Sequence, residues 1–135
     1  MPYDTDVSPL KLKAPLPRDL FSTQAEEAAK RCAANKNSNA ASQIRRFYDE
    51  LAMWAEQVMR APAAERENRF REVEPYIQML RAKAAYALSR KLITEEFNQF
   101  IRSLVSSIDS PESLENGKLF FEAFLGFKKC FDSLH

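Results

Sequence analysis

The chain has 135 residues, of which 45% are hydrophobic and 29% are charged, and its formal net charge is +1. This length and composition fit one globular domain, and the small net charge gives no argument for a nucleic-acid partner by itself. Glycine occurs only twice, while Ala, Glu, Lys, Arg, Leu and Phe dominate. We therefore expect an all-α protein, a compact bundle of about five helices.

The cysteine and histidine content argues against a fold held by disulfide bonds or by a metal ion. Cys32 and Cys130 belong to no CxxC pair, and the one histidine is the terminal His135. This pattern is typical of a reducing compartment and not of a disulfide framework or a zinc site. No apolar run approaches the roughly 18 residues of a membrane span, and the N-terminus lacks the apolar core of a signal peptide. We expect a cytoplasmic protein that needs no cofactor.

The first 41 residues are the least regular part of the chain. Residues 1–18 contain four prolines and no hydrophobic period, which indicates an extended lead whose leucines, Leu10, Leu12 and Leu16, are candidates for packing. Residues 19–34 are Ala-rich and weakly amphipathic, which predicts a short helix that the polar segment 35–39 ends. We interpret residues 1–41 as an N-terminal extension and residues 42–135 as the main helical domain.

Hydrophobic residues recur every three or four positions over residues 42–60, the period of one amphipathic helix. Its apolar stripe consists of Ile44, Phe47, Leu51, Trp54, Ala55 and Val58. Arg45 and Arg46 lie on the polar side, each four residues before a carboxylate, Asp49 or Glu50. Two interpretations of these arginines stay open: intrahelical ion pairs or contacts with a ligand.

Residues 75–91 combine a helical period with a local positive charge. They carry Arg81, Lys83, Arg90 and Lys91, and no acidic residue occurs from position 75 to 94. Residues 92–135, by contrast, hold four cations against seven acids. Such a concentration on one predicted helix is the electrostatic footprint of a protein that binds a polyanion. The same charges also fit a solvated surface or, at positions 90 and 91, a helix C-terminus.

The helical wheel of residues 75–91 separates a buried face from a basic edge. Lys83 and Arg90 lie on nearly the same line, two turns and about 10 Å apart, with Tyr86 near them. This edge can present two cations and a phenol to a ligand, and the spacing can reach phosphates of a nucleic-acid backbone. Arg81 falls on the opposite flank. The buried stripe consists of Ile77, Leu80, Ala84 and Leu88.

The remaining segments predict connectors and two further helices. Residues 61–74 mix arginines with glutamates, which favours a short connecting helix or loop that ends at Pro75. Thr94 fits the N-cap of a helix that reaches Ile108, and Ser110 with Pro111 fits the start of the last one. Five phenylalanines give this last helix an apolar arc wider than one seam needs. It is either the central helix of the bundle or meets another copy of the chain.

The residue types most often used in catalysis are absent or scattered. The terminal position of the one histidine argues against a Ser-His-Asp or Cys-His arrangement, and no HExxH pattern occurs. Neither glycine belongs to a phosphate-binding loop. We therefore expect a protein that is not an enzyme.

Four sequence blocks together resemble one family. They are SQIRRFYDEL at 42–51, LRAKAAYALSRK at 80–91, FNQFIRSL at 97–104 and LFFEAFLGFKK at 119–129. Their order and spacing resemble the small subunit of the type III-A CRISPR interference complex, the Csm complex, over roughly residues 42–130. The second block departs slightly, because Leu88 and Ser89 precede Arg90 where a small residue and glycine are commoner. Residues 1–41 have no counterpart in this resemblance.

The resemblance implies a non-catalytic structural subunit of the antiviral ribonucleoprotein. It implies that several copies line up alongside the guide-RNA-binding backbone subunits, with the large polymerase-like subunit as a further partner, and that they contact the target strand of the guide–target RNA duplex, mainly through its backbone. The predicted RNA-binding residues are Arg45, Arg46, Arg81, Lys83, Arg90 and Lys91. The family motif supplies four of them, and the charge distribution adds Arg81 and Lys91. The alternative is a helical protein–protein adaptor that does not touch nucleic acid.

Overall fold

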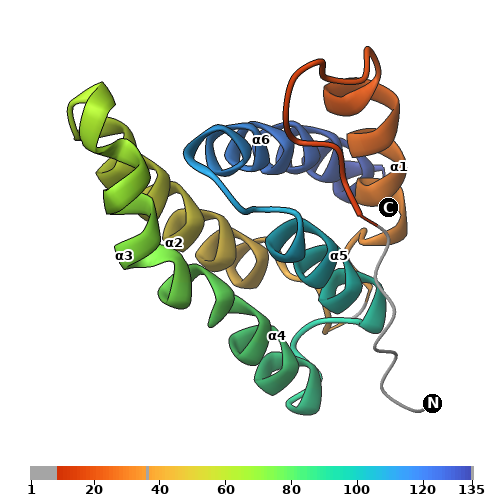
Figure 1. Cartoon of the computed structure of the whole chain (residues 1–135). Helices are drawn as coiled ribbons and strands as arrows, with labels where there is room; N and C mark the ends of the chain where they lie inside the picture. Colours follow the sequence, from red (N-terminus) through yellow and green to blue (C-terminus); the bar gives the residue numbers. More distant parts are fainter. Residues whose placement is uncertain (1–8, 36, 135) are drawn as a thin grey trace.

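The computed structural model describes residues 9–35 and 37–134, and these residues are mostly helical. The α-helices are α1 (Ala25–Arg31), α2 (Ala41–Arg60), α3 (Arg66–Gln78), α4 (Leu80–Ser89), α5 (Glu95–Ser106) and α6 (Pro111–Ser133). Two short helical turns, η1 (Leu20–Gln24) and η2 (Ala63–Glu65), precede α1 and α3. The described residues contain no β-strand, so the predicted all-α class is confirmed (Figure 1). Residues 1–8 of the predicted lead and His135 lie outside the described residues.

The helices form one bundle in which α3 and α6 each pack against several other elements. Figure 1 shows α3 and α4 as a bent rod along one side of the molecule, with α2 beside α3 and α5 beside α4. On the other side, α6 packs against α1, α2 and η1. With α3 and α4 counted as one rod, the bundle has the predicted five helical units. Phe120, Phe121 and Phe124 of the apolar arc of α6 are thus covered inside the protomer, as expected for a central helix, whereas Phe127 and Phe131 are half-buried.

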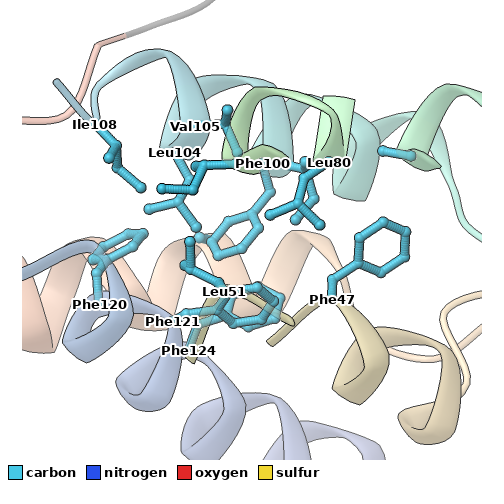
Figure 2. Packing of buried hydrophobic residues seen from close by; sticks show 14 of the residues in the cluster. Phe47, Leu51, Leu80, Phe100, Leu104, Val105, Ile108, Phe120, Phe121 and Phe124 are labelled. Carbon is cyan, nitrogen blue, oxygen red and sulfur yellow. The ribbon is translucent and has the colours of Figure 1, made fainter. Parts of the chain in front are cut away.

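Phenylalanines from α2, α5 and α6 fill the centre of the bundle (Figure 2). Phe100 of α5 stacks on Phe124 of α6 with ring centroids 4.1 Å apart, and Phe121 meets both rings edge-on. Phe121 and Phe124 are fully buried. Trp54 packs against this core but keeps part of its surface exposed, where it stacks on Tyr76 of α3 at 5.3 Å. Truncation of a buried Phe to Ala typically costs about 3–5 kcal/mol.

The segment before α2 contributes to the same core. Its buried apolar side chains are Leu12, Leu20, Ala25, Ala28, Ala29 and Cys32. Hydrogen bonds hold the described part of the lead, among them those from the Leu10 N–H to the Ser107 hydroxyl (2.8 Å) and from the Asn116 amide to the Leu12 carbonyl (2.8 Å). The described part of the lead, from residue 9 on, is therefore packed against the end of α5 and against α6. The division into residues 1–41 and 42–135 stays a prediction.

The sequence predicts one helix over residues 75–91, and this is wrong. Pro75 lies inside α3, which ends at Gln78, and α4 begins at Leu80 after a single turn residue, Met79. Proline has no N–H to donate and its ring crowds the preceding turn, which bends a helix. The rod continues because the Met79 N–H donates to the Pro75 carbonyl and the Lys83 N–H to the Met79 carbonyl (3.1 Å each). Residues 66–74 accordingly belong to α3 and not to a connector.

The predicted helix starts at Thr94 and Ser110 are confirmed. The Thr94 hydroxyl accepts from the Phe97 N–H at 3.4 Å. Ser110, which directly precedes Pro111, forms a capping box with Ser113. Each side chain thus satisfies a backbone donor that has no partner within its own helix. These caps fix where α5 and α6 begin.

Candidate nucleic-acid interface

A groove of about 510 Å³ lies between α2 and α4, and we call it the α2–α4 groove. Its apolar lining consists of Phe47, Met79, Leu80, Ala82, Ala87 and Leu92. Its polar lining consists of Gln43, Arg46, Glu50, Lys83 and Tyr86. Residues from two of the four family-like blocks therefore meet in space, although more than 30 positions separate them along the chain.

Lys83 reaches across this groove to α2. Its ammonium group forms an ion pair with the Glu50 carboxylate at 2.7 Å, with 47% and 23% of the two side chains exposed. Arg46 is exposed and forms no ion pair with any residue in the described part of the chain. The intrahelical pair of Arg46 with Glu50, one of the two sequence interpretations, is thus not formed, because Glu50 pairs with Lys83.

Arg90 connects to the groove through Tyr86. Its guanidinium donates to the Tyr86 hydroxyl at 3.0 Å and lies 5.8 Å from the centre of the phenol ring. Tyr86 is 62% exposed, which is unusual for a ring of this size. Arg90 therefore holds an exposed aromatic ring at the edge of the groove, on the basic edge that the sequence predicts.

Arg45 points to a different part of the surface. It pairs with Asp49 at 3.1 Å and its guanidinium lies 5.2 Å from the ring of Tyr48, so the intrahelical interpretation is correct for this arginine. Arg45 lines a second groove, together with Lys128 and Lys129 of α6. Because both partners of the Arg45–Asp49 pair are 62% exposed, the pair contributes little to stability.

Arg81 and Lys91 do not line the α2–α4 groove. Arg81 is half-buried on α4, and Lys91 follows the end of that helix. Of the six residues predicted to bind RNA, Arg46 and Lys83 line the same groove, Arg90 joins them through its bond to Tyr86, and Arg45, Arg81 and Lys91 lie elsewhere.

Sequence reasoning misses Glu50 as a partner of Lys83, and it misses Gln43 and Met79 as lining residues. The four-residue spacing of Arg46 and Glu50 indicates an intrahelical pair, and no local signal reveals a partner 33 positions away. Gln43 and Met79 carry no pattern that distinguishes them from other surface residues. Contacts between helices decide these cases.

The described residues hold no group of three or more His, Cys, Asp or Glu side chains that could bind a metal ion. No described helix has the length and apolar character to cross a membrane. Cys32 is buried, and this burial raises the pKa of its thiol to about 12, whereas Cys130 is exposed. His135 lies outside the described residues.

Fold and groove define a small all-helical protein with cations from two helices beside an apolar groove. The family model Csm2 Type III-A matches residues 16–133, so the chain belongs to this family, that of the small subunit of the type III-A Csm complex. The predicted resemblance is thereby confirmed, and the match also takes in η1 and α1. Other subunits of this CRISPR effector are its partners. No curated protein and no solved structure matches the chain significantly.

Proposed function

We propose that this chain is a non-catalytic subunit that binds the backbone of the target RNA strand inside the type III-A complex. The observation that carries the proposal is the convergence of Arg46 and Lys83 on the α2–α4 groove. Both residues come from sequence blocks that resemble the family. Within the complex, further copies of the chain, the backbone subunits and the large subunit are the proposed neighbours, in the cytoplasm.

The chemistry of the two cations suits phosphate. A guanidinium such as that of Arg46 presents a planar fork of donors that matches two phosphate oxygens, and the Lys83 ammonium acts as a point charge. The Lys83–Glu50 pair is partly exposed, and exposed pairs contribute only about 0–1 kcal/mol. A phosphate can therefore replace Glu50 at little cost. Such contacts hold a strand in register without reading its sequence.

Arg90, Arg45, Arg81 and Lys91 stay in the proposal as additional contacts. Arg90 stands at the edge of the α2–α4 groove through its bond to Tyr86. Arg45 lies on the same helix as Arg46 but beside a second groove, so one strand must pass over α2 to meet both. Arg81 and Lys91 are included only because they belong to the locally basic segment 75–91.

The second candidate function is a protein–protein adaptor without nucleic-acid contact. The observation that favours it is the exposure of large apolar side chains on α2 and α3–α4. Met53, Tyr76 and Met79 are 42%, 51% and 49% exposed, and such surfaces are typical of protein contacts. Both functions can coexist in a subunit of a large complex.

Titration of the full chain with single-stranded RNA separates the two functions. We would measure fluorescence anisotropy with three unrelated RNAs of equal length at several salt concentrations. A phosphate-binding protein should bind all three RNAs with similar affinity. The logarithm of its binding constant should fall linearly with the logarithm of the salt concentration, with a slope of about −0.7 for each phosphate contact. An RNA affinity that does not change with salt concentration, or no detectable RNA binding, would favour the adaptor function.

A further inference from the structure

We propose that the α2–α4 groove also holds one unpaired nucleobase of the bound strand, stacked on Tyr86. This inference rests on the proposed function, since it needs an RNA strand at the groove. It goes further, because phosphate contacts alone need only exposed cations. The groove therefore discriminates a nucleotide with an accessible base from a bare sugar–phosphate chain.

The lining of the groove is more apolar than a phosphate site requires. Phe47, Leu80 and Ala87 line it and are 8%, 1% and 6% exposed, so they form its inner wall. Met79 lines it and is half exposed. A volume of about 510 Å³ lies in the range of about 300–1,000 Å³ common for pockets that bind small ligands. An apolar wall of this kind suits a flat aromatic ring.

Tyr86 supplies a stacking surface that is already oriented. Its hydroxyl accepts from Arg90, whose guanidinium lies 5.8 Å from the ring centre. The ring stays 62% exposed and lines the groove. Single-stranded nucleic acid is commonly bound by aromatic rings on which bases stack, next to a cationic track for the backbone. Tyr86 with Arg90 fits the first role, and Arg46 with Lys83 fits the second.

Charge decides which occupant the groove fits. Arg46, which forms no ion pair with any described residue, and Lys83, which pairs with Glu50, line the same groove as the apolar wall, so an occupant that suits the whole groove carries both negative charge and apolar surface. A nucleotide carries a phosphate and a flat ring one sugar apart. An apolar side chain of a second protein would leave Arg46 without a partner and would bring no phosphate to Lys83. A paired base has its edge engaged and its faces stacked, so the base must be unpaired.

The test compares two single-stranded RNAs of equal length, one ordinary and one with abasic residues at its central positions. We would titrate both with the full chain at several salt concentrations. The ordinary strand should bind roughly 5- to 150-fold more tightly, the range expected for one stacked base, while both strands give the same salt slope. This comparison needs no substitution in the protein.

Tyr86→Ala is the matching protein variant. The affinity of this variant for the ordinary strand should fall by the same factor that separates the two strands in the unchanged protein. Its affinity for the abasic strand should change little. Tyr76→Ala is the matched control, because it removes a similarly exposed tyrosine of the same rod that lines no part of this groove. It should leave both affinities unchanged.

Three results would overturn the inference. Equal binding of the two strands with a normal salt slope would remove the base site and leave the proposed function intact. Equal losses on both strands in Tyr86→Ala would show that the ring only positions Arg90. A missing salt slope would contradict the proposed function, and the base site with it.

Discussion

Glu50 on α2 and Lys83 on α4 form an ion pair of 2.7 Å across the groove that we propose binds RNA. The carboxylate thus occupies the partner position that a phosphate oxygen would take. An RNA strand that reaches Lys83 must displace Glu50 or approach close to its negative charge. Glu50 should therefore weaken RNA binding.

The substitution Glu50→Gln tests this consequence. It removes the negative charge and frees Lys83, so RNA affinity should rise by about 2- to 5-fold, the effect of an exposed ion pair worth ~0.4–1 kcal/mol. The control Asp49→Asn removes the same charge next to Arg45, outside the α2–α4 groove. Its effect on affinity should be smaller. Weaker binding by Glu50→Gln would mean that Glu50 orients Lys83 for the ligand instead of competing with it.

Asn39 and Thr94 should matter for stability and not for RNA. The Asn39 amide donates to the Thr94 hydroxyl at 2.8 Å and to the Cys32 carbonyl at 3.2 Å, and its oxygen accepts from the Thr94 N–H at 2.9 Å. Asn39 is fully buried and has a left-handed backbone, with φ of 59°. The residue thereby ties the segment before α2 to the start of α5.

Asn39→Ala removes these hydrogen bonds and strains the backbone. We expect it to lower the free energy of unfolding by about 2–4 kcal/mol in urea titrations. Asn39→Gly keeps the left-handed backbone without strain, so its loss should be smaller. The exposed Asn37→Ala serves as control and should stay within about 0.5 kcal/mol. A loss by Asn39→Ala no larger than that of the control would refute the role of this residue.

Lys91, the second residue after α4, has a backbone conformation that glycine prefers. Its φ is 62°, and the helix closes with the Leu92 N–H donating to the Ala87 carbonyl (3.0 Å) and the Lys91 N–H to the Leu88 carbonyl (2.9 Å). Lys91→Gly should therefore raise the unfolding free energy by about 0.5–1 kcal/mol. Lys91→Ala loses the same charge and keeps the strain, so it should bring no such gain. Equal stabilities of the two variants would contradict this account of the helix end.

Periodicity predicts most of this fold because amphipathic helices carry their core face in local spacing. The caps at Thr94 and Ser110 lie as expected, and three phenylalanines of the last helix, among them Phe121 and Phe124, lie in the core. The prediction fails at Pro75, where proline chemistry suggests a helix start but the chain bends and continues. Tertiary packing of α3 and α4 on their neighbours compensates for the one hydrogen bond that proline removes.

The candidate site is predictable only in part. Lys83, Arg90 and Tyr86 share a helix edge, so their grouping follows from the wheel. That Arg46 joins them, and that Arg45 does not, depends on how α2 lies against α4 and α6. Adjacent residues on a helix point about 100° apart, so the crossing of helices decides which of the two meets Lys83. No local pattern holds that information.

Burial of Cys32 predicts a thiol that reacts only after unfolding. Desolvation raises its pKa from 9.0 to about 12, and the reactive species is the thiolate. At pH 8, native protein should label quickly at the exposed Cys130 and slowly at Cys32, and denatured protein at both. Equally fast native labelling of both would contradict the burial.

The same shift has a pH consequence. The unfolded thiol releases its proton near pH 9, whereas the folded one keeps it to about pH 12. The unfolded state therefore binds fewer protons in this window, and stability should fall as pH rises, by up to ~1.4 kcal/mol per pH unit from this group. Cys32→Ala should show a shallower fall.

The central claim, that the α2–α4 groove binds RNA through phosphate contacts, is tested most directly by the double variant Arg46→Ala/Lys83→Ala. Its control is Arg60→Ala/Arg71→Ala, which removes two cations that pair with Glu56, Glu67 and Glu74 instead. Both double variants lose the same net charge. A difference between their RNA affinities therefore depends on where the cations lie and not on total charge.

We would titrate both double variants and the unchanged protein with unrelated single-stranded RNAs over a range of salt. The groove variant should lose about tenfold in affinity for each contact, equally for every sequence, and its salt slope should become shallower by about 1.4 units for two contacts. The control should bind like the unchanged protein. If the groove variant keeps its affinity and slope, or loses no more than the control, Arg46 and Lys83 are ordinary solvated charges and the claim is wrong.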